Sequence, residues 1–426
     1  MEHLKRAGAA DAADLSAVTD TVTGMLRDIR DGGIDAVRTY SQRLDDYAPD
    51  DFRVAEETIE RAIDEVPDDL RRAIDFAHDQ VRRFAEAQLG TLANLELETE
   101  PGVVLGHRHI PVDRVGAYVP GGRYSLIASS YMSIIPAKVA GVKEVHVATP
   151  PRAGRIHPGL LYSAHRAGAD TIHAVGGVQA LAALAYGALP GVAPVDMLVG
   201  PGNRYVVEAK RQLFGQVGID LLAGPTEIGI IADDTADPFI VACDLVGQAE
   251  HDPFSRAILI TTSRQLAMAV IGQMDEHLSA VSTEEVARQC WENGGEVILV
   301  ADEDEMVAVC DDYAIEHVEV LVREPERFIE RLTHYGSLFV GEEATVAYGD
   351  KVSGPNHILP TKRAARFTGG LWVGKFLKTV TYQRMDRPGS MLMAEHCEVE
   401  SLAEGMDAHA RTATVRLERY ARRQAS

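Results

Sequence analysis

The chain has 426 residues, 46% of them hydrophobic, so it is long enough to bury a large core and to divide into two or three globular units. Its formal net charge of −22 excludes a typical nucleic-acid-binding surface, because phosphate binding requires a basic patch. The chain contains no apolar run of the roughly 18 residues that a membrane span needs, and residues 1–20 lack a signal-peptide core, so we expect a cytoplasmic protein.

Lysine and cysteine usage add two expectations. Only eight of the 42 basic residues are lysine, and an acidic, lysine-poor surface is typical of a halophilic protein that stays soluble in concentrated salt. The four cysteines, at positions 243, 290, 310 and 397, form no C-x-x-C pair, so we expect buried thiols rather than disulfides or a thiolate zinc site. A nucleophilic Cys243 is the lesser alternative.

The chain opens with a helical region, in which apolar residues recur at helical spacing from Ala13 to about Gln88. Between about Val103 and Leu222, short β-branched runs alternate with alanine-rich helical runs. Strands are expected at 115–119, 145–148, 171–175 and 196–199, and helices at 127–142, 160–167 and 180–188. This order implies right-handed crossovers and a mainly parallel, Rossmann-like sheet.

A second α/β region follows, with strands expected at 228–231, 257–261, 296–300, 319–322 and 337–340 and helical segments between them. One of these helices begins at Asp237-Pro238, an N-cap followed by proline, and ends before Asp252-Pro253. The tail from about Gly389 to Ser426 is rich in Ala, Glu and Arg and predicts a helix.

Three glycine-bearing turns follow strands of the first α/β region: Tyr118-Val119-Pro120-Gly121-Gly122, Gly176-Gly177-Val178-Gln179 and Gly200-Pro201-Gly202-Asn203. Each places backbone amides and a polar side chain at the carboxyl end of a strand, where open parallel sheets hold ligands. None is a complete G-x-G-x-x-G motif, so the turns predict either a loosely bound nucleotide or only tight turns.

Polar pairs in the second region are candidates for chemistry. Gln248 and His251 are three residues apart on the expected helix, so both side chains can reach one small ion, although a solvated helix end has the same pattern. The turn-rich segment 349–361 holds Asp350, which suits either a metal or an Asx turn, and His357, an imidazole for a ligand.

Glu316-His317 ends a helical run just before an apolar strand. An adjacent carboxylate and imidazole can divide proton transfer, since the carboxylate polarises water while the imidazole exchanges the proton of a hydroxyl. An ordinary surface pair is the alternative. Half of the lysines lie in the following stretch and indicate an anion site: Lys351, Lys362, Lys375 and Lys378.

Taken in order, these segments resemble the histidinol dehydrogenase family from about residue 20 to residue 420. The resemblance rests on V-G-A-Y-V-P-G-G, V-G-G-V-Q-A-L-A-A-L-A-Y-G, V-G-P-G-N-R-Y-V-V-E-A-K-R, A-G-P-T-E, Q-A-E-H, Y-A-I-E-H, S-G-P-N-H-I-L-P-T and E-G-M-D-A-H. A series of motifs in the correct order and spacing is far more specific than any one of them.

The resemblance implies an α/β fold of two incomplete Rossmann-like domains with mainly parallel sheets and helical additions at both ends, assembled as a homodimer. The expected parts are a helical arm over 1–20, a metal-bearing catalytic domain over 21–117 and 227–365, an NAD-contacting domain over 118–226, and a helical tail over 366–426 that reaches the partner subunit.

The resemblance also implies a role for each matching residue. One zinc ion would be held by an oxygen and nitrogen set that also suits manganese: Gln248, His251, Asp350 and His409. Glu316 would activate water against an aldehyde, and His317 would exchange protons with the alcohol. The other substrate-binding positions are Thr226, Lys351, His357 and Glu404, with Glu404 and His409 expected from the partner subunit. The NAD contacts would be Tyr118, Gln179 and Asn203.

The implied reaction is two hydride transfers to two NAD molecules, from a primary alcohol through a retained aldehyde to a carboxylate. The chain departs from typical histidinol dehydrogenases at Thr226, Ile315 and Lys351, where the family has Ser, Pro and Tyr. The segments P-G-G-R-Y-S-L-I-A-S-S-Y-M and G-G-L-W-V-G-K-F-L-K-T-V-T-Y-Q-R-M look like its sulfopropanediol dehydrogenase branch.

The substrate expectation follows from these departures. Positive charge from Lys351 or Arg123 would suit a sulfonate, so 2,3-dihydroxypropane-1-sulfonate is slightly favoured over L-histidinol, the alternative. A metal-dependent hydrolase, which could use the same donors, is the alternative from another class.

Overall fold

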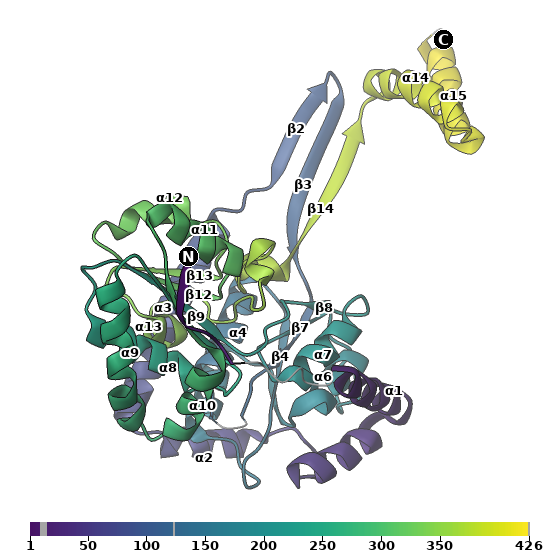
Figure 1. Ribbon diagram of the computed structural model, residues 1–426. Helices are drawn as coiled ribbons and strands as arrows, with labels where there is room; N and C mark the ends of the chain where they lie inside the picture. The colour runs from purple at the N-terminus through teal and green to yellow at the C-terminus, as the bar shows by residue number, and fades with distance from the viewer. Residues whose placement is uncertain (9–14, 122–123, 425–426) are drawn as a thin grey trace. The chain divides into compact units, whose positions relative to one another are not determined.

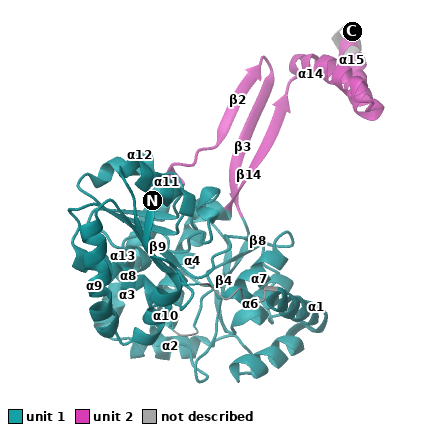
Figure 2. Ribbon diagram, viewed as in Figure 1, with its two compact units in different colours: residues 1–88, 112–376 teal, residues 89–111, 377–426 magenta. Residues whose placement is uncertain are grey.

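The structure, a computed structural model, describes residues 1–8, 15–121 and 124–424. The chain divides into two compact units (Figure 2). The first unit comprises residues 1–88 and 112–376, and the second comprises residues 89–111 and 377–426. Both mainly parallel sheets belong to the first unit. This unit also contains every candidate site residue from Tyr118 to His357.

The first sheet of unit 1 has six strands in the order β1-β11-β10-β9-β12-β13, all parallel except β1. Figure 1 labels β9, β12 and β13 of this sheet. Their bounds are β1 Glu2–Lys5, β9 Glu227–Ala232, β10 Arg256–Thr261, β11 Gly295–Leu299, β12 His317–Leu321 and β13 Ser337–Val340. The accompanying helices are α8 Pro238–Ala249, α9 Arg264–Ser279, α10 Glu284–Gly294, α11 Glu303–Tyr313, α12 Phe328–Arg331 and α13 Val346–Lys351, with the 3₁₀ turn η1 Pro325–Arg327.

Packing explains the central strands of this sheet. Every residue of β9 is buried, because apolar clusters cover both faces of a parallel sheet and favour near-continuous aliphatic runs. Helix α8 begins as its sequence predicts: the Asp237 side chain accepts a hydrogen bond from the Phe239 amide, and Pro238 occupies the first turn.

The second sheet of unit 1 has five parallel strands in the order β6-β5-β4-β7-β8. Their bounds are β4 Arg114–Tyr118, β5 Glu144–Thr149, β6 Thr171–Ala174, β7 Met197–Val199 and β8 Gly218–Ile219. The helices are α1 Leu15–Asp45, α2 Glu56–Glu65, α3 Asp68–Gly90, α4 Ile127–Ala140, α5 Pro158–Ala167, α6 Gly177–Tyr186 and α7 Arg204–Leu213. These two mainly parallel sheets confirm the expected α/β fold class with Rossmann-like units.

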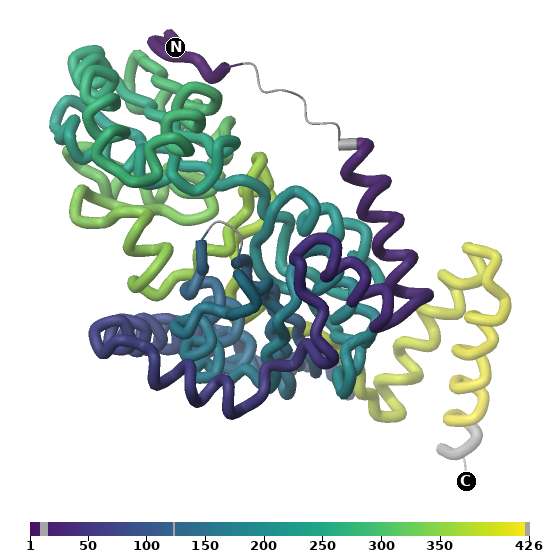
Figure 3. The backbone as a smooth tube through the Cα atoms, turned by 90° about the horizontal axis from the view of Figure 1, so that it is seen from below, coloured from purple at the N-terminus to yellow at the C-terminus, as the bar shows by residue number. Residues whose placement is uncertain are grey.

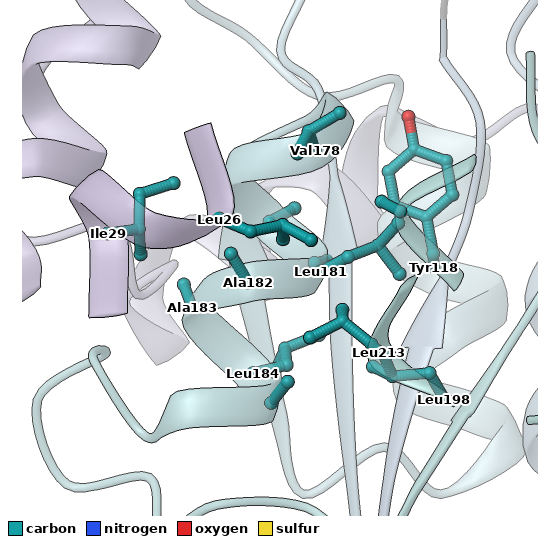
Figure 4. Packing of buried hydrophobic residues seen from close by; sticks show 14 of the residues in the cluster. Leu26, Ile29, Tyr118, Val178, Leu181, Ala182, Ala183, Leu184, Leu198 and Leu213 are labelled. Atoms are coloured by element: carbon teal, nitrogen blue, oxygen red, sulfur yellow. The ribbon is translucent and has the colours of Figure 1, made fainter. Parts of the chain in front are cut away.

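The position of α1 differs from the expected domain boundaries. Leu26 and Ile29 of α1 pack on Leu181 and Ala182 of α6 (Figure 4), and Figure 3 shows the two helices side by side. Residues 21–45 therefore pack with the five-stranded sheet rather than with the six-stranded sheet, which belongs to the expected catalytic domain. Strand β4 of the five-stranded sheet begins at Arg114, before the expected domain boundary at 118. Periodicity predicted the helix but not the surface that it covers.

The expected helical arm over residues 1–20 is corrected for its first residues, because Glu2–Lys5 form a strand antiparallel to β11. The Lys5 ammonium fixes this strand by donating to the carbonyls of Trp291 and Gly295, both at 2.7 Å. Four residues are too short to show a period of two, so this strand depends on its neighbour. Residues 9–14 of the arm lie outside the described residues, and α1 begins at Leu15.

The second unit contains an antiparallel sheet and two helices. Strands β2 Leu95–Glu100, β3 Val103–Pro111 and β14 Leu377–Met385 pair in the order β14-β3-β2. Helices α14 Arg387–Ala403 and α15 Asp407–Gln424 lie side by side (Figure 3). The expected helical tail over 366–426 is therefore α-helical only from Arg387 onward. Before Arg387 it contains strand β14 and the short 3₁₀ turn η3 Val373–Phe376, and its first residue ends another 3₁₀ turn, η2 Ala364–Arg366.

Two further expectations concern the cysteines and membrane-spanning helices. Cys290 and Cys310 are buried as expected, whereas Cys243 and Cys397 are exposed, and all four are free thiols. Among the described residues, no helix has the length and apolarity that a bilayer crossing requires.

Candidate active site

The expected catalytic residues gather at the amino ends of β9 and β12. Thr226 immediately precedes β9, while Glu316 and His317 lie at the start of β12, and these parallel strands are neighbours. Helix α8 brings Gln248 to the same place near its end, and α13 brings Asp350. Residues separated by more than 120 positions in the chain thus form one cluster, which sequence spacing alone could not establish.

Glu316 and His317 form a buried acid–base pair. One carboxylate oxygen of Glu316, Oε2, accepts hydrogen bonds from the Thr226 hydroxyl at 2.5 Å and from the Glu227 amide at 2.9 Å. The same oxygen lies 3.4 Å from Nδ1 of His317. Burial alone would lower the pKa of His317, but the charges of Glu316 and Asp350 outweigh it and raise that pKa well above its ordinary value.

The two ring nitrogens of His317 have different surroundings. Its Nδ1 is fixed by the Glu227 carbonyl oxygen at 3.1 Å, which places a proton on Nδ1 and the lone pair of the neutral ring on Nε2. Nε2 is 3.5 Å from Oδ1 of Asp350, too long for a well-formed hydrogen bond, and it has no other hydrogen-bond partner within the part of the chain that the structure describes. A buried nitrogen of this kind can accept the proton of a bound hydroxyl.

His251 and Asp350 form the second half of the cluster. Nε2 of His251 lies 3.8 Å from Oδ2 of Asp350. Burial lowers the pKa of His251, which favours the neutral imidazole that binds metals. Burial alone would raise the pKa of Asp350, but its electrostatic interaction with the nearby His317 ring outweighs burial, lowers that pKa and keeps this carboxylate ionised.

The donors present fit a zinc ion. Two ligand atoms 3.8 Å apart can share one ion, because zinc bonds to nitrogen and oxygen are about 2 Å long. The amide nitrogen of Gln248 donates to the Thr226 hydroxyl, so its amide oxygen is the atom left for a metal. Within residues 1–8, 15–121 and 124–424, no three His, Cys, Asp or Glu side chains converge as a metal site, so a zinc site at Gln248, His251 and Asp350 stays a prediction.

Glu404 and His409, the remaining expected site residues, belong to the second unit. Glu404 caps the end of α14 and His409 lies in the first turn of α15, and both side chains are exposed. Their contribution to a site stays a prediction.

A cavity of about 520 Å³ adjoins the cluster. Gln248, His251, Asp350 and Lys351 line it together with Tyr124 and Tyr131. This volume lies within the range of about 300–1,000 Å³ that is usual for small-molecule sites. The exposed side chain of Lys351 gives the wall a positive charge beside the candidate metal ligands.

Helix α4 holds the segment that carries Asp350. The hydroxyl of Tyr131 donates to the carbonyl of Lys351 at 2.5 Å. His357 links the hydroxyl of Ser129, 2.9 Å from its Nε2, to the carbonyl of Asp350, 3.0 Å from its Nδ1. Burial lowers the pKa of His357 to about 4, so the ring is neutral and both nitrogens are occupied. In this arrangement His357 positions Asp350, and a direct substrate contact stays a prediction.

Sequence reasoning missed these supporting residues of α4. The signal was present as polar residues in an otherwise apolar helix, Ile127–Ala140, in which Ser129 and Ser130 are buried. Glu227 was missed as well. Burial and the charge of Glu316 raise its pKa to about 7, so a third carboxyl belongs to the acid–base cluster.

The structure brings together two of the three expected NAD contacts. The hydroxyl of Tyr118, at the carboxyl end of β4, accepts a hydrogen bond from the Gly177 amide at 3.2 Å. Gln179, in the first turn of the following helix, donates to Asp45 at 2.9 Å. Asn203 instead caps α7, since its side chain accepts from the amides of Tyr205 and Val206.

A buried ion pair holds the third turn. Lys210 and Asp220 pair with each other inside the protein, and Lys210 donates to the Gly200 carbonyl while Asp220 accepts from the Gly200 amide. Gly200 has φ +117°, and a Cβ there would lie 2.0 Å from the Tyr118 carbonyl oxygen. Only glycine fits this close approach, so the Gly200 turn packs directly against the carboxyl end of β4.

These features are those of an enzyme: the α/β fold is Rossmann-like, and a buried acid–base pair and metal-type donors adjoin a cavity. The family model for histidinol dehydrogenase matches residues 9–417. The chain therefore belongs to the histidinol dehydrogenase family, whose members are oxidoreductases. This result gives no support to the metal-dependent hydrolase that we kept as an alternative.

Individual relatives agree with the family. The chain is 51% identical over 403 residues, 95% of both chains, to a histidinol dehydrogenase homolog of Shouchella clausii. It is 48% identical over 423 residues, 99% of this chain and 97% of the relative, to a sulfopropanediol 3-dehydrogenase of Ruegeria pomeroyi. The crystal structure of histidinol dehydrogenase from Elizabethkingia anophelis superposes with a TM-score of 0.90 at 32% identity, covering 97% of this chain and 94% of that one.

Proposed function

We propose that this chain is an NAD-dependent, zinc-requiring dehydrogenase that oxidises a primary alcohol through an aldehyde to a carboxylate. The observation that carries the proposal is the buried ring of His317, whose Nδ1 lies beside Glu316 and whose Nε2 lies beside Asp350 and has no hydrogen-bond partner among the described residues. Family membership supplies the reaction class, and the donor set of Gln248, His251 and Asp350 supports zinc as the metal.

The chain's own residues supply the proton chemistry. When bound, zinc polarises the alcohol oxygen and NAD accepts a hydride in each oxidation. The flanking carboxylates make the His317 ring a stronger base than free histidine, and its neutral form accepts the hydroxyl proton at Nε2. Glu316, held by Thr226 and the Glu227 amide, polarises the water that attacks the aldehyde. Because Glu316 and His317 are buried, the reactive aldehyde is shielded from bulk solvent.

We further propose that the active enzyme is a homodimer in which the partner subunit's His409 completes the metal site and the partner's Glu404 contacts substrate. The second unit exposes large apolar side chains that favour burial against another protein surface: Leu95, Leu97, Leu105, Val399, Leu402 and Met406. The exposed positions of Glu404 and His409 in that same unit are compatible with this role.

The favoured substrate is an anionic alcohol, 2,3-dihydroxypropane-1-sulfonate, ahead of L-histidinol. Lys351 lines the cavity, and an ammonium attracts a sulfonate but repels a cationic amino alcohol. The relative from Ruegeria pomeroyi named for sulfopropanediol supports the same class. Arg123, the other expected source of positive charge, lies outside the described residues.

Steady-state turnover with both alcohols tests the substrate. The wild type is expected to oxidise the sulfonated diol with a kcat/KM at least about tenfold above that for histidinol, and Lys351→Met is expected to remove most of this preference. Lys143→Met, which changes an exposed lysine that lies outside the cavity lining, is the matched control and should leave the preference intact. Efficient oxidation of histidinol alone would eliminate the sulfonate substrate.

A further inference from the structure

Two carboxyl groups that the proposed mechanism does not use meet beneath the cavity. Glu319 lies in the middle of β12 and is completely buried, and its Oε1 accepts a hydrogen bond from the Val346 amide at 2.8 Å. Asp244 lies on α8 and lines the cavity, and its Oδ1 accepts from the Thr345 hydroxyl at 3.1 Å. Thr345 and Val346 begin α13, so three elements meet at this pair.

Burial and contact with each other favour a single proton on this carboxyl pair. Burial raises the pKa of both groups, and the charge of Asp244 adds to this effect at Glu319, whose pKa rises to about 8, whereas the hydrogen bond with Glu319 lowers the pKa of Asp244. The second oxygen of Glu319, Oε2, is buried and has no hydrogen-bond partner among the described residues, and a proton on this carboxyl pair would satisfy it. Two carboxylates in contact inside a protein cannot both stay ionised at neutral pH.

Each of the three elements carries a residue of the candidate active site on the face that it turns to this pair. Asp244 precedes Gln248 by one helical turn on α8, and Val346 precedes Asp350 by one turn on α13. Glu319 follows His317 by two residues on β12, so the two side chains emerge from the same face of the strand. The spacing of α8, α13 and β12 at the pair therefore sets the spacing of Gln248, Asp350 and His317.

We propose that Asp244 and Glu319, joined by one shared proton, are positioning residues that fix the distance between the metal-binding donors and the acid–base pair. This inference rests on the proposed function for the existence of a metal. Loss of the proton would place two negative charges in contact and push α8 away from β12 and α13, which would open the donor set before any ligand itself is changed.

The pH dependence has a defined sign. The pKa of Glu319 in the folded protein is raised from an ordinary value of 4.5 to about 8, so folding favours its protonated form. The stability that this proton contributes is fully present below pH 4.5 and is lost as the pH rises through about 8. The nearby titratable group is the thiol of Cys243, whose pKa burial and the two carboxyls raise, so it stays neutral over this range.

Two substitutions of Glu319 test the proposal. Glu319→Gln keeps an acceptor for the Val346 amide and a permanent hydrogen-bond donor, so zinc affinity at pH 7 should be unchanged, and stability should fall less steeply than in wild type between pH 5 and 8. Glu319→Leu removes both functions and should weaken zinc binding by about 10–100-fold, as loss of supporting residues around metal ligands does. Glu342→Leu, at an exposed position between β13 and α13, is the control and should bind zinc like wild type.

Zinc affinity is measured by competition with a chromophoric chelator, and stability by urea unfolding at several pH values. Wild-type zinc affinity in Glu319→Leu, or the same pH dependence of stability in Glu319→Gln and wild type, would overturn the proposal. If Glu319→Leu fails to fold, the Glu319→Gln comparison still decides. These assays need no turnover, so a failure of the wild type to reduce NAD would refute the proposed function without altering their result.

Discussion

His317→Asn is expected to lower kcat by about 10²–10⁴-fold, the range typical of a lost general acid–base group. Asparagine has a similar reach and can still donate to the Glu227 carbonyl that His317 contacts at 3.1 Å, but it cannot accept a proton at the position of Nε2. Zinc content and the KM for NAD should therefore change little. The measurement is steady-state NADH formation from the alcohol by zinc-loaded enzyme.

The control for this variant is His165→Asn, which changes an exposed imidazole in the last turn of α5. It should retain wild-type turnover. Normal NADH formation by His317→Asn would remove His317 from the mechanism. The companion variant Glu316→Gln should slow oxidation of the aldehyde supplied directly, because water activation is lost.

His251→Ala is expected to lose zinc and to lower kcat/KM by at least about 100-fold, more than the 10–100-fold typical of residues that only support metal ligands. The reason is geometric: Nε2 of His251 lies 3.8 Å from Asp350, and removing it leaves a buried carboxylate and an amide as the donors of this subunit. Metal analysis of the purified protein and NADH formation with and without added zinc are the measurements.

Chelation of the wild type should reproduce the His251→Ala defect, and added zinc should restore activity to the wild type alone. Full turnover by metal-free wild type would show that the donor set has another purpose. Asn356→Ala, close in sequence to the candidate ligands but engaged with the Met132 carbonyl, should keep its zinc and serves as the comparison.

The central strands could be predicted from sequence because burial on both faces leaves a strong composition signal. Strand β9 reads Glu-Ile-Gly-Ile-Ile-Ala, and the turns on either side delimit it. Strands β2 and β14 lack this signal: every residue of β2 is exposed, so glutamates alternate with leucines in a pattern that also suits a loop. Their pairing with β3 is a property of the fold, which local propensity does not encode.

The candidate site was predicted in part. Helical spacing placed Gln248 beside His251, and the Glu316-His317 dipeptide was visible as an acid–base pair. The contact of that pair with Asp350 depends on the packing of α13 against α8 and β12, which no spacing reveals. Glu319 could have been noticed, because a glutamate inside the run Val318-Glu319-Val320 is expensive to bury unless it is paired or protonated.

The most direct test of a shared metal site is subunit complementation. His317→Asn and His409→Ala homodimers are purified separately, shown to be inactive, and then mixed under conditions in which subunit exchange is verified by native mass spectrometry. Each heterodimer would hold one intact site, so activity should return to about a quarter of the wild-type value after random exchange. Verified heterodimers without any regained activity would contradict a metal site that is completed by the partner subunit's His409.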